Sequence, residues 1–356
     1  MTTNKLPTNI LVAPLNWGLG HAARCIIIIK ELEKNGYNPI IASDGPSLLL
    51  LKKEFPHLTS LELPSYSIKY PKNYRYFKLK LLFKSPIIAK AIVSERKLVN
   101  KWIKEHSLGG IISDNRLGVY SKRVPSVYIT HQLKVLSGST TWISSKIHSY
   151  FIRKFKECWV PDIEGKNNLS GELGHLINTN LTIKYIGLLS RMEKKNIPIK
   201  YKLMILLSGP EPQRTLLEEK LIEKLKNYSN KVVFIKGVVE ADQKIEQIGN
   251  VTFYNYMQTE QLETTFNESE MVLSRSGYTT IMDLTKLEKK AYFIPTPGQF
   301  EQEYLASKYK YQGFVPSIKQ SRFRLEHLNA MHLFNGLPKI NSNTNWSELF
   351  GLFQSK

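Results

Sequence analysis

The chain has 356 residues, a formal net charge of +20 and only two cysteines, Cys25 and Cys158. Two cysteines exclude a disulfide framework and a four-cysteine zinc site, and they favour a reducing cytoplasm. The apolar runs are too short for a signal peptide or a spanning helix, and the length allows two ordinary domains. The positive charge indicates a negative partner or a negative surface nearby.

The first predicted strand, residues 10–14, leads into a glycine-rich loop and then a helix. The loop and the start of the helix contain Gly18, Leu19, Gly20, His21 and Arg24. Glycine lets the backbone approach phosphate oxygens, and an imidazole titrates near working pH. We therefore expect an acceptor or phosphate loop, with His21 as the first choice for the base that takes a proton from a hydroxyl. Two alternatives stay open: His21 binds a diphosphate, or the loop is only a tight turn.

The most basic part of the chain is residues 66–105, which hold eleven Lys or Arg residues against two acids, Glu95 and Glu105. The aromatic side chains among them are Tyr66, Tyr70, Tyr74, Tyr76, Phe77, Phe83 and Trp102. Cations beside aromatic and aliphatic side chains favour an anionic membrane surface, where each cation contributes about 1 kcal/mol. The alternative is a solvated helical face. Nucleic acid is not expected, because no nucleic-acid-binding signature accompanies the charge.

Two more predicted strands of the first half end at polar residues. Asp114 follows strand 110–113 directly, which is a usual place for a catalytic carboxylate. It is the rival of His21 for the role of base, although an Asp at this point also favours capping the next helix. His131 and Gln132 follow the strand at 126–130 and are predicted to line the same cleft from the acceptor side.

Short apolar runs alternate with longer periodic runs along the whole chain, which is typical of α/β domains with parallel sheets. We predict an N-terminal acceptor domain at 1–187, a charged hinge linker at 188–202 and a C-terminal donor domain at 203–356. Each domain is predicted to be a doubly wound, Rossmann-like unit, and the two face each other across a cleft. The predicted strands are 10–14, 39–43, 58–63, 110–113, 126–130 and 158–161 in the first domain, and 203–207, 232–236, 251–254, 271–273 and 291–294 in the second.

The most informative stretch lies in the second half, where strand 271–273 turns at Ser276 and Gly277 into a helix predicted at 278–288. The first turn of such a helix has unpaired N–H groups, and its dipole adds positive charge, so its N-terminus is suited to a diphosphate. A second motif, residues 295–302, follows another apolar strand at the place where parallel sheets bind ligands. The predicted donor-binding residues from both motifs are Arg275, Ser276, Gly277, Tyr278, Thr279, Thr280, Asp283, Gln299, Glu301 and Gln302.

Individual roles follow from the chemistry of these side chains. Asp283, about one turn into the helix, is expected to reach a ribose or sugar hydroxyl, and Arg275 is expected to neutralise charge on the departing diphosphate. Glu301 and Gln302 are an acceptor and a two-way amide that together suit vicinal hydroxyls. Ser208 and Gly209 end the first strand of the second half and are predicted to offer N–H groups or a hydroxyl to the phosphates.

These two motifs resemble those of the glycosyltransferase family 28-type enzymes that include MurG and the plant monogalactosyldiacylglycerol synthases. The resemblance covers roughly the whole chain and implies the GT-B fold, a UDP-sugar donor and inversion at the anomeric carbon. It also implies a backbone contact between Met257 and the uracil. It places a lipid-linked or glycan acceptor at the N-terminal half, for an enzyme of the cell envelope that works at the inner face of the membrane. Two departures are Asp283, where the family usually has Glu, and Leu305, where Asn is common.

No Asp-x-Asp motif for a divalent metal is present, so no metal and no cofactor besides the UDP-sugar co-substrate are expected. Helix dipoles and backbone N–H groups would then stabilise the leaving diphosphate. Two other functions stay open for the same fold. One is a UDP-sugar epimerase, which would form product without an acceptor. The other is a non-catalytic nucleotide-sugar or lipid-binding protein, which would bind donor but transfer nothing.

Overall fold

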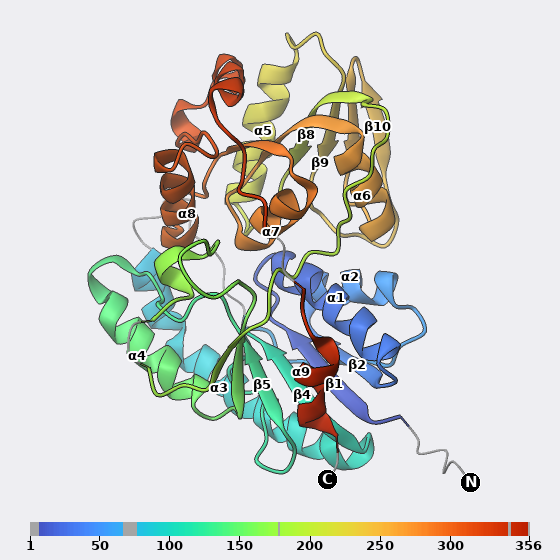
Figure 1. The fold of residues 1–356 in the computed structure, drawn as a ribbon, viewed down its shortest axis with the longest axis vertical. Coiled ribbons are helices and arrows are strands. Elements are labelled where there is room, and N and C mark those ends of the chain that lie inside the picture. The colour runs from blue at the N-terminus through green and yellow to red at the C-terminus, as the bar shows by residue number, and fades with distance from the viewer. Residues whose placement is uncertain (1–6, 67–76, 177–178, 341–342, 355–356) are drawn as a thin grey trace.

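The computed structural model describes residues 7–66, 77–176, 179–340 and 343–354, with the backbone alone for residues 77–84. The chain forms two α/β halves, one above the other in Figure 1, each built on its own sheet. The predicted fold class, two doubly wound domains, is confirmed.

Within the described residues, the N-terminal half contains a parallel sheet in the order β3-β2-β1-β4-β5-β6-β7. Its strands are β1 (Asn9–Pro14), β2 (Asn38–Ser43), β3 (Ser60–Glu62), β4 (Leu108–Asp114), β5 (Ser126–Ile129), β6 (Glu157–Val160) and β7 (Ile183–Tyr185). The chain starts in the middle, at β1, and the strand order reverses between β1 and β4, which is where ligands bind in such sheets. The register places Pro14 beside Asp114. The loop after β1 therefore lies next to Asp114.

The described part of the C-terminal half contains a second sheet in the order β10-β11-β9-β8-β12-β13. Its strands are β8 (Tyr201–Leu206), β9 (Val232–Ile235), β10 (Ile245–Ile248), β11 (Val251–Tyr254), β12 (Ser269–Ser274) and β13 (Lys290–Phe293). All pairs are parallel except β10 with β11. Because Leu206 pairs with Ser274, the loops after β8 and β12 meet at one edge of this sheet.

Helices connect the strands and cover the sheets. In chain order they are α1 (Gly20–Lys34), α2 (Gly45–Glu54), α3 (Phe77–Glu105), α4 (Thr141–Ile152), α5 (Gln213–Leu225), α6 (Thr259–Asn267), α7 (Tyr278–Leu287), α8 (Phe300–Tyr311) and α9 (Trp346–Phe350). In Figure 1, α7 and α8 lie on the side of the upper half that faces the lower half, and α1 lies beneath α7. The carboxyl edges of the two sheets therefore face each other.

The predicted strands are confirmed, but the sequence missed β7 and β10. β7 is half-buried and β10 is exposed at every position, so neither has the apolar run that marks a buried strand. The two sheets end at Tyr185 and begin again at Tyr201. The division of the chain at 188–202 stays a prediction.

The end of the chain returns to the N-terminal half, although residues 203–356 are predicted as the C-terminal domain. α9 lies beside the lower sheet in Figure 1. The Tyr37 hydroxyl donates to Phe350 O at 2.9 Å, and the two rings are in edge contact. Phe353 fills the space above Gly110 of β4, where a Cβ would lie 2.2 Å from its ring. The C-terminal segment therefore ties the two halves together.

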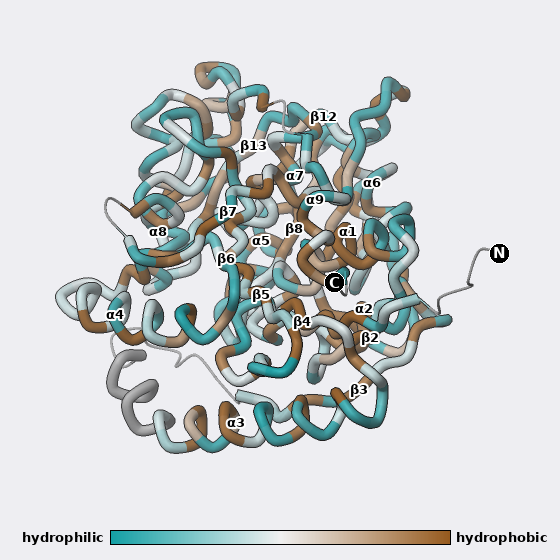
Figure 2. The backbone as a smooth tube through the Cα atoms, turned by 60° about the horizontal axis from the view of Figure 1, so that its bottom comes forward, coloured by the Kyte–Doolittle hydropathy of each residue, from teal (hydrophilic) through white to brown (hydrophobic). Residues whose placement is uncertain are grey.

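The basic stretch is arranged differently from the prediction. Residues 67–76 and the side chains of 77–84 lie outside the description, and Tyr66 and Trp102 are buried. Tyr66 donates to Glu95 at 2.9 Å, so these two aromatics pack inside rather than facing a membrane. In Figure 2, α3 runs along the bottom of the molecule and α4 lies at its left side. No helix of the described chain is long and apolar enough to cross a bilayer.

Candidate active site

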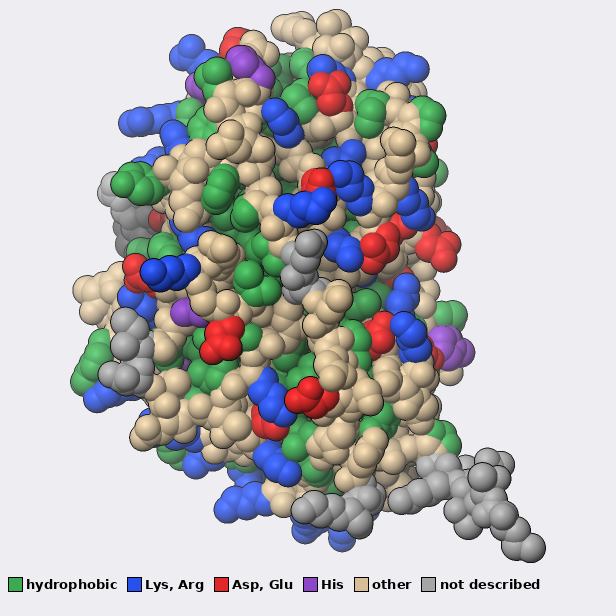
Figure 3. Space-filling view, in the orientation of Figure 1, with side chains coloured by type: hydrophobic (Ala, Val, Ile, Leu, Met, Phe, Trp, Pro, Cys, Tyr) green, Lys and Arg blue, Asp and Glu red, His purple; other side chains and the backbone are tan. Residues whose placement is uncertain are grey.

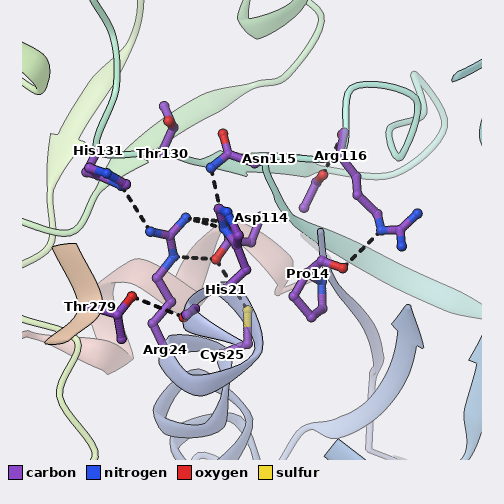
Figure 4. A network of polar contacts seen from close by, with 12 residues as sticks. Pro14, His21, Arg24, Cys25, Asp114, Asn115, Arg116, Thr130, His131 and Thr279 are labelled. Carbon is purple, nitrogen blue, oxygen red and sulfur yellow. Dashed lines mark hydrogen bonds and ion pairs between the residues drawn. The ribbon is translucent and has the colours of Figure 1, made fainter. Parts of the chain in front are cut away.

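His21, Arg24 and Asp114 form a buried cluster at the carboxyl edge of the first sheet. α1 places His21 and Arg24 on one face because they are three residues apart, and β4 ends on Asp114. His21 Nδ1 lies 2.8 Å from Asp114 Oδ1. Arg24 donates from Nε and Nη2 to the two oxygens of Asp114. Figure 4 shows the three side chains pointing toward one another.

The protonation of this cluster follows from its partners. His21 Nδ1 lies 2.8 Å from Asp114 Oδ1, which only accepts hydrogen bonds, and 2.9 Å from Arg24 Nη2, which only donates them. Because Arg24 Nη2 already donates to Asp114 Oδ1, we assign the Nδ1 proton to the bond with Asp114, and Nε2 keeps its lone pair. Burial lowers the pKa of His21, Asp114 opposes this effect, and Arg24 adds to it. Burial alone would raise the pKa of Asp114, but Arg24 and His21 outweigh it and hold that pKa well below its usual range. His21 is therefore a neutral base near pH 7, beside a permanent carboxylate.

A second histidine connects this cluster to the C-terminal half. Arg24 Nη1 lies 3.0 Å from His131 Nδ1, and His131 Nε2 lies 2.7 Å from Glu301 Oε1. Gln132 donates to the other oxygen, Glu301 Oε2. Burial would raise the pKa of Glu301, but His131, His21 and Arg24 outweigh it and lower that pKa. The sequence predicts His131 and Gln132 on the acceptor side and Glu301 on the donor side, and the structure brings all three together.

The N-terminus of α7 faces the N-terminus of α1. Gly277 is the N-cap of α7, with φ −73° and no side-chain cap. A Cβ at Gly277 would meet only Thr280 Oγ1, at 3.9 Å, so neither the backbone nor its neighbours require glycine here. Thr279 Oγ1 donates to Gly20 O at 3.1 Å across the interface. Open space beside an uncapped helix N-terminus suits an anionic ligand.

The role predicted for Arg275 is wrong. Its side chain is 1% exposed and donates to the backbone carbonyls of Gln213, Ile294 and Pro295. Because its guanidinium is bound to these carbonyls inside the C-terminal half, it stabilises the junction of α5 with the end of β13. Its charge is directed at these carbonyls and not at a diphosphate.

The Tyr278 side chain joins the two halves, so only its backbone N–H is left for a donor. Its hydroxyl donates to Pro161 O at 2.9 Å. Its ring stacks on His131 with the centroids 4.2 Å apart and the planes 5° from parallel. Ser276 is also engaged, since its hydroxyl donates to Gln302 O at 2.8 Å. The helix end therefore offers backbone groups more than side chains.

Among the described residues, the side chains of Asp283 and Gln302 each form one hydrogen bond. Ser190 donates to Asp283 Oδ1 at 2.7 Å, and burial raises the pKa of Asp283 to about 6 against the opposing effects of Arg191 and Ser190. Gln302 Oε1 accepts from Thr296 N at 2.8 Å, which leaves its Nε2 for a sugar hydroxyl. Sequence reasoning missed Ser190, because nothing in the charged linker marks it.

The loops after β1, β8 and β13 meet near the end of α7. Gly18 and Gly209 have φ of 86° and 107°, which favour glycine, and a Cβ on Gly18 would lie 3.7 Å from Gly209 Cα. Thr296 is 1% exposed, and its hydroxyl has no hydrogen-bond partner in the described chain. It lies 3.8 Å from the place of a Cβ on Gly209. Thr296 is a missed candidate, although its position between Pro295 and Pro297 was a signal.

The remaining predicted contacts stay predictions. The Met257 side chain is buried and its sulfur accepts from Thr265 at 3.4 Å, so only its backbone is left for a base. Gln299 is the N-cap of α8, and Ser208 lies in the loop after β8. Among the described residues, no three His, Cys, Asp or Glu side chains are placed to hold one metal ion.

The contacts across the predicted cleft show that the two halves are closed on each other. A cavity of about 620 Å³ also lies between the halves, but none of the predicted site residues lines it. It is bordered by Lys30, Glu54 and Gln258, among others. The contacts of Thr279 with Gly20 and of Glu301 with His131 join the two halves beside the place predicted for the donor. We therefore expect the halves to separate while a ligand enters and to close again once it is bound.

Comparison with known proteins agrees with this geometry. Residues 213–343 match the family model "Glycosyltransferase family 28 C-terminal domain". A relative from Clostridium perfringens, "UDP-N-acetylglucosamine--N-acetylmuramyl-(pentapeptide) pyrophosphoryl-undecaprenol N-acetylglucosamine transferase", is 23% identical over 338 residues, covering 91% of this chain and 88% of its own.

Two solved structures are similar over nearly the whole chain. Acinetobacter baumannii MurG has a TM-score of 0.51 at 15% identity, with 92% of each chain covered. A UDP-glucosyltransferase from Polygonum tinctorium has a TM-score of 0.64 at 12% identity, covering 99% of this chain and 100% of its own. Likeness at such low identity shows the fold alone, and that fold is GT-B.

Proposed function

We propose that this chain is a MurG-like glycosyltransferase of the family 28 type and that it moves a hexose or an N-acetylhexosamine from a UDP-sugar to an acceptor hydroxyl, with inversion at the anomeric carbon. One observation carries the proposal. The neutral His21, supported by Asp114, stands at the end of α1 that faces the uncapped end of α7. A proton acceptor and the proposed anion site thus lie close to each other at the interface between the halves.

The donor diphosphate is proposed to bind at the N-terminus of α7. Its N–H groups and the helix dipole are fixed in place before the reaction, which is the condition for stabilising charge on a leaving group. The open side of Gly277 gives the phosphate oxygens room. The Thr296 hydroxyl supplies one further donor. With Arg275 occupied elsewhere, these groups would supply the charge stabilisation without a metal.

In the proposed reaction, the acceptor oxygen attacks the anomeric carbon from the face opposite the diphosphate. His21 Nε2 takes the hydroxyl proton as the new C–O bond forms. The bond to the diphosphate breaks, and UDP leaves with the electron pair. The resulting imidazolium lies 2.8 Å from the Asp114 carboxylate, which stabilises its charge. Asp114 itself is fully buried against Arg24, so it positions the base and does not replace it.

UDP and UDP-sugars, unlike GDP, dTDP or CDP, are expected to raise the melting temperature by mass action, with or without EDTA. Gly277→Asp is expected to weaken UDP binding by more than about tenfold, or about 1.4 kcal/mol. The new carboxylate repels the diphosphate, yet an N-cap Asp suits a helix and the site has room for a Cβ.

Gly351→Asp is the matched control, because Gly351 also has open space around it and lies in the segment that returns to the N-terminal half. It should bind UDP like the wild type. A wild-type protein that no uridine nucleotide stabilises, or a loss only on addition of EDTA, would overturn the donor site as proposed.

The acceptor is proposed to be lipid-linked or membrane-proximal, reached from an anionic inner membrane face. α4 carries four apolar side chains that are each more than half exposed: Trp142, Ile143, Ile147 and Tyr150. Lys146 Nζ lies 3.9 Å from the centre of the Trp142 ring, and Lys154 Nζ lies 4.3 Å from that of Tyr150. In the orientation of Figure 3, Lys and Arg side chains are spread over both halves. The exposed apolar face, rather than charge alone, supports α4 as the proposed membrane contact.

Ile147→Glu is expected to weaken binding to vesicles with about 30–40% anionic lipid by about tenfold or more. It removes apolar area that membrane binding would bury, and it adds a negative charge that the anionic lipid repels. Co-sedimentation with such vesicles measures this. Ile245→Glu is the matched control, since Ile245 is equally exposed on β10 of the other half. Equal losses in the two variants would mean that α4 is not the contact.

A further inference from the structure

We infer that His131 and Gln132 of the N-terminal half are positioning residues that orient Glu301 of the C-terminal half for two neighbouring hydroxyls of the donor sugar. This inference rests on the proposed function and adds to it the residues that complete the sugar subsite. It also changes the role that the sequence predicts for His131 and Gln132, from acceptor contacts to supports of a donor contact.

Arg24 fixes the state of His131. A guanidinium only donates hydrogen bonds, so Nδ1 of His131, 3.0 Å from Arg24 Nη1, is the acceptor. The ring proton is therefore on Nε2, which lies 2.7 Å from Glu301 Oε1 and donates to it. Arg24, on the other side of the ring, therefore sets the direction of the hydrogen bond from His131 to Glu301. The neutral form of the ring is sufficient for this bond.

The plane of the His131 ring is also fixed. The ring is stacked on Tyr278 at 4.2 Å, and the hydroxyl of Tyr278 is held by Pro161 O. Tyr278 is the first residue of α7, the helix whose end is proposed to hold the diphosphate. Tyr278 therefore takes part in two features: its ring holds His131, which supports Glu301, and its backbone begins the helix end proposed as the anion site.

The carboxylate of Glu301 keeps capacity for a ligand after these contacts. Each oxygen accepts one hydrogen bond from the N-terminal half, Oε1 from His131 and Oε2 from Gln132. A carboxylate has about four acceptor positions, so each oxygen accepts one more. Its side chain is 26% exposed, which leaves a path for a ligand. A sugar with two adjacent hydroxyl donors matches such a pair of oxygens.

Two consequences follow for the reaction. Glu301 has its orienting partners only while the halves are closed, because α8 belongs to one half and His131 and Gln132 to the other. In addition, Arg24 holds both Asp114 and His131, so the base and the sugar subsite depend on one buried guanidinium. The sugar is therefore recognised in the same closed state in which His21 is in place.

The test compares the affinity of UDP, which lacks the sugar, with that of UDP-glucose and UDP-N-acetylglucosamine. His131→Phe keeps the stacking on Tyr278 but loses both hydrogen bonds. It is expected to weaken UDP-sugar binding about tenfold relative to UDP, the value of one good hydrogen bond to a charged group. His131→Gln, whose amide both accepts and donates, should restore most of this preference.

Three further variants make the result decisive. Glu301→Gln should lower the UDP-sugar preference too, and adding His131→Phe to it should change little more, because both act through one carboxylate. Gln132→Leu, at a half-buried position, should also lower the preference for UDP-sugar over UDP. It replaces His131→Phe in the test if that variant folds poorly. His175→Phe is the control: His175 also stacks on a tyrosine, Tyr185, and pairs with a carboxylate, Asp162, but it has no contact with Glu301.

Equal weakening of UDP and UDP-sugar in His131→Phe, or an unchanged preference in both His131→Phe and Gln132→Leu, would overturn the inference while leaving the proposed function intact. Wild-type protein that binds neither UDP nor UDP-sugar would overturn the proposed function and this inference with it.

Discussion

His21→Ala is expected to lower kcat for sugar transfer by about a thousandfold while leaving the affinity for the UDP-sugar nearly unchanged, which is the usual size of a general-base contribution. The physical reason is the tautomer set by Asp114, which leaves Nε2 as the only basic atom of the ring. Initial rates of transfer and donor affinity, measured separately, check this. A weaker donor affinity with kcat preserved would instead make His21 a ligand of the diphosphate.

Asp114→Asn tests whether Asp114 is itself the base or only positions His21 as the base. It should also lower kcat, and it should reduce stability by about 3–5 kcal/mol, because it leaves Arg24 buried with one partner fewer. A chemical denaturation curve for the variant identifies the part of the loss that comes from unfolding. Activity that survives in His21→Ala but is absent from a folded Asp114→Asn would make Asp114 the base.

The pH profile gives an independent check on His21. Because burial and Arg24 lower its pKa, the acid limb of the kcat profile should lie below pH ~6.5, the ordinary value for histidine. Asp114 has its pKa held far lower and so contributes nothing to that limb. An acid limb that lies well above the ordinary histidine value would contradict a neutral, buried His21.

Much of the fold follows from apolar periodicity alone. The central strands β1, β4, β8 and β12 are short buried runs, and the order in which they alternate with helices predicts parallel sheets. β10 has no such run, because it is an exposed edge strand whose one partner among the described strands is β11. The packing of α9 against the N-terminal half is equally hard to predict from sequence, because its contact with Tyr37 joins residues that are 313 positions apart.

The candidate site shows what a single sequence contains and what it lacks. The end of α7 and the loop before α1 are local features, so glycine and histidine positions predict them. Arg275 is next to Ser276 in sequence, but its side chain is buried and donates to the backbone of Gln213, 62 residues away. The sequence position of a residue does not reveal which way its side chain points. The pair of His131 and Glu301 is 170 residues apart. Such a pair becomes visible only when the two halves are placed together.

Asp283→Asn is expected to make the protein more stable at pH 7 by roughly 1–3 kcal/mol, an effect that follows from the raised pKa of this carboxyl. Burial raises that pKa to about 6, so the folded state holds a proton that the unfolded chain has lost between about pH 4 and pH 6. By linkage, the free energy of unfolding of the wild type falls as pH rises through this window. Asn does not titrate, so the difference between the two proteins should grow from pH 4.5 to pH 6.5 and then stay level in urea denaturation.

Asp162→Asn is the matched control with the opposite sign. Asp162 is equally buried, but its pKa is lowered, because hydrogen bonds from His175, Ser170 and the backbone outweigh its burial. Its stabilising effect is present at neutral pH and is lost as pH falls through that lowered pKa, so Asp162→Asn should destabilise the protein. If both variants gained or lost stability alike, the raised pKa of Asp283 would not be the cause.

A buried carboxylate that costs stability calls for a functional reason, and ribose binding supplies one. Ser190 holds Oδ1 of Asp283, and the other oxygen is proposed to accept a ribose hydroxyl of the donor. Asp283→Asn should therefore weaken UDP binding by about tenfold or more, the range for a hydrogen bond to a charged group. A variant that is more stable and binds UDP more weakly shows the trade-off between stability and function expected at a ligand site. Unchanged UDP affinity in the stabilised variant would remove Asp283 from the donor site and leave the ribose to backbone groups.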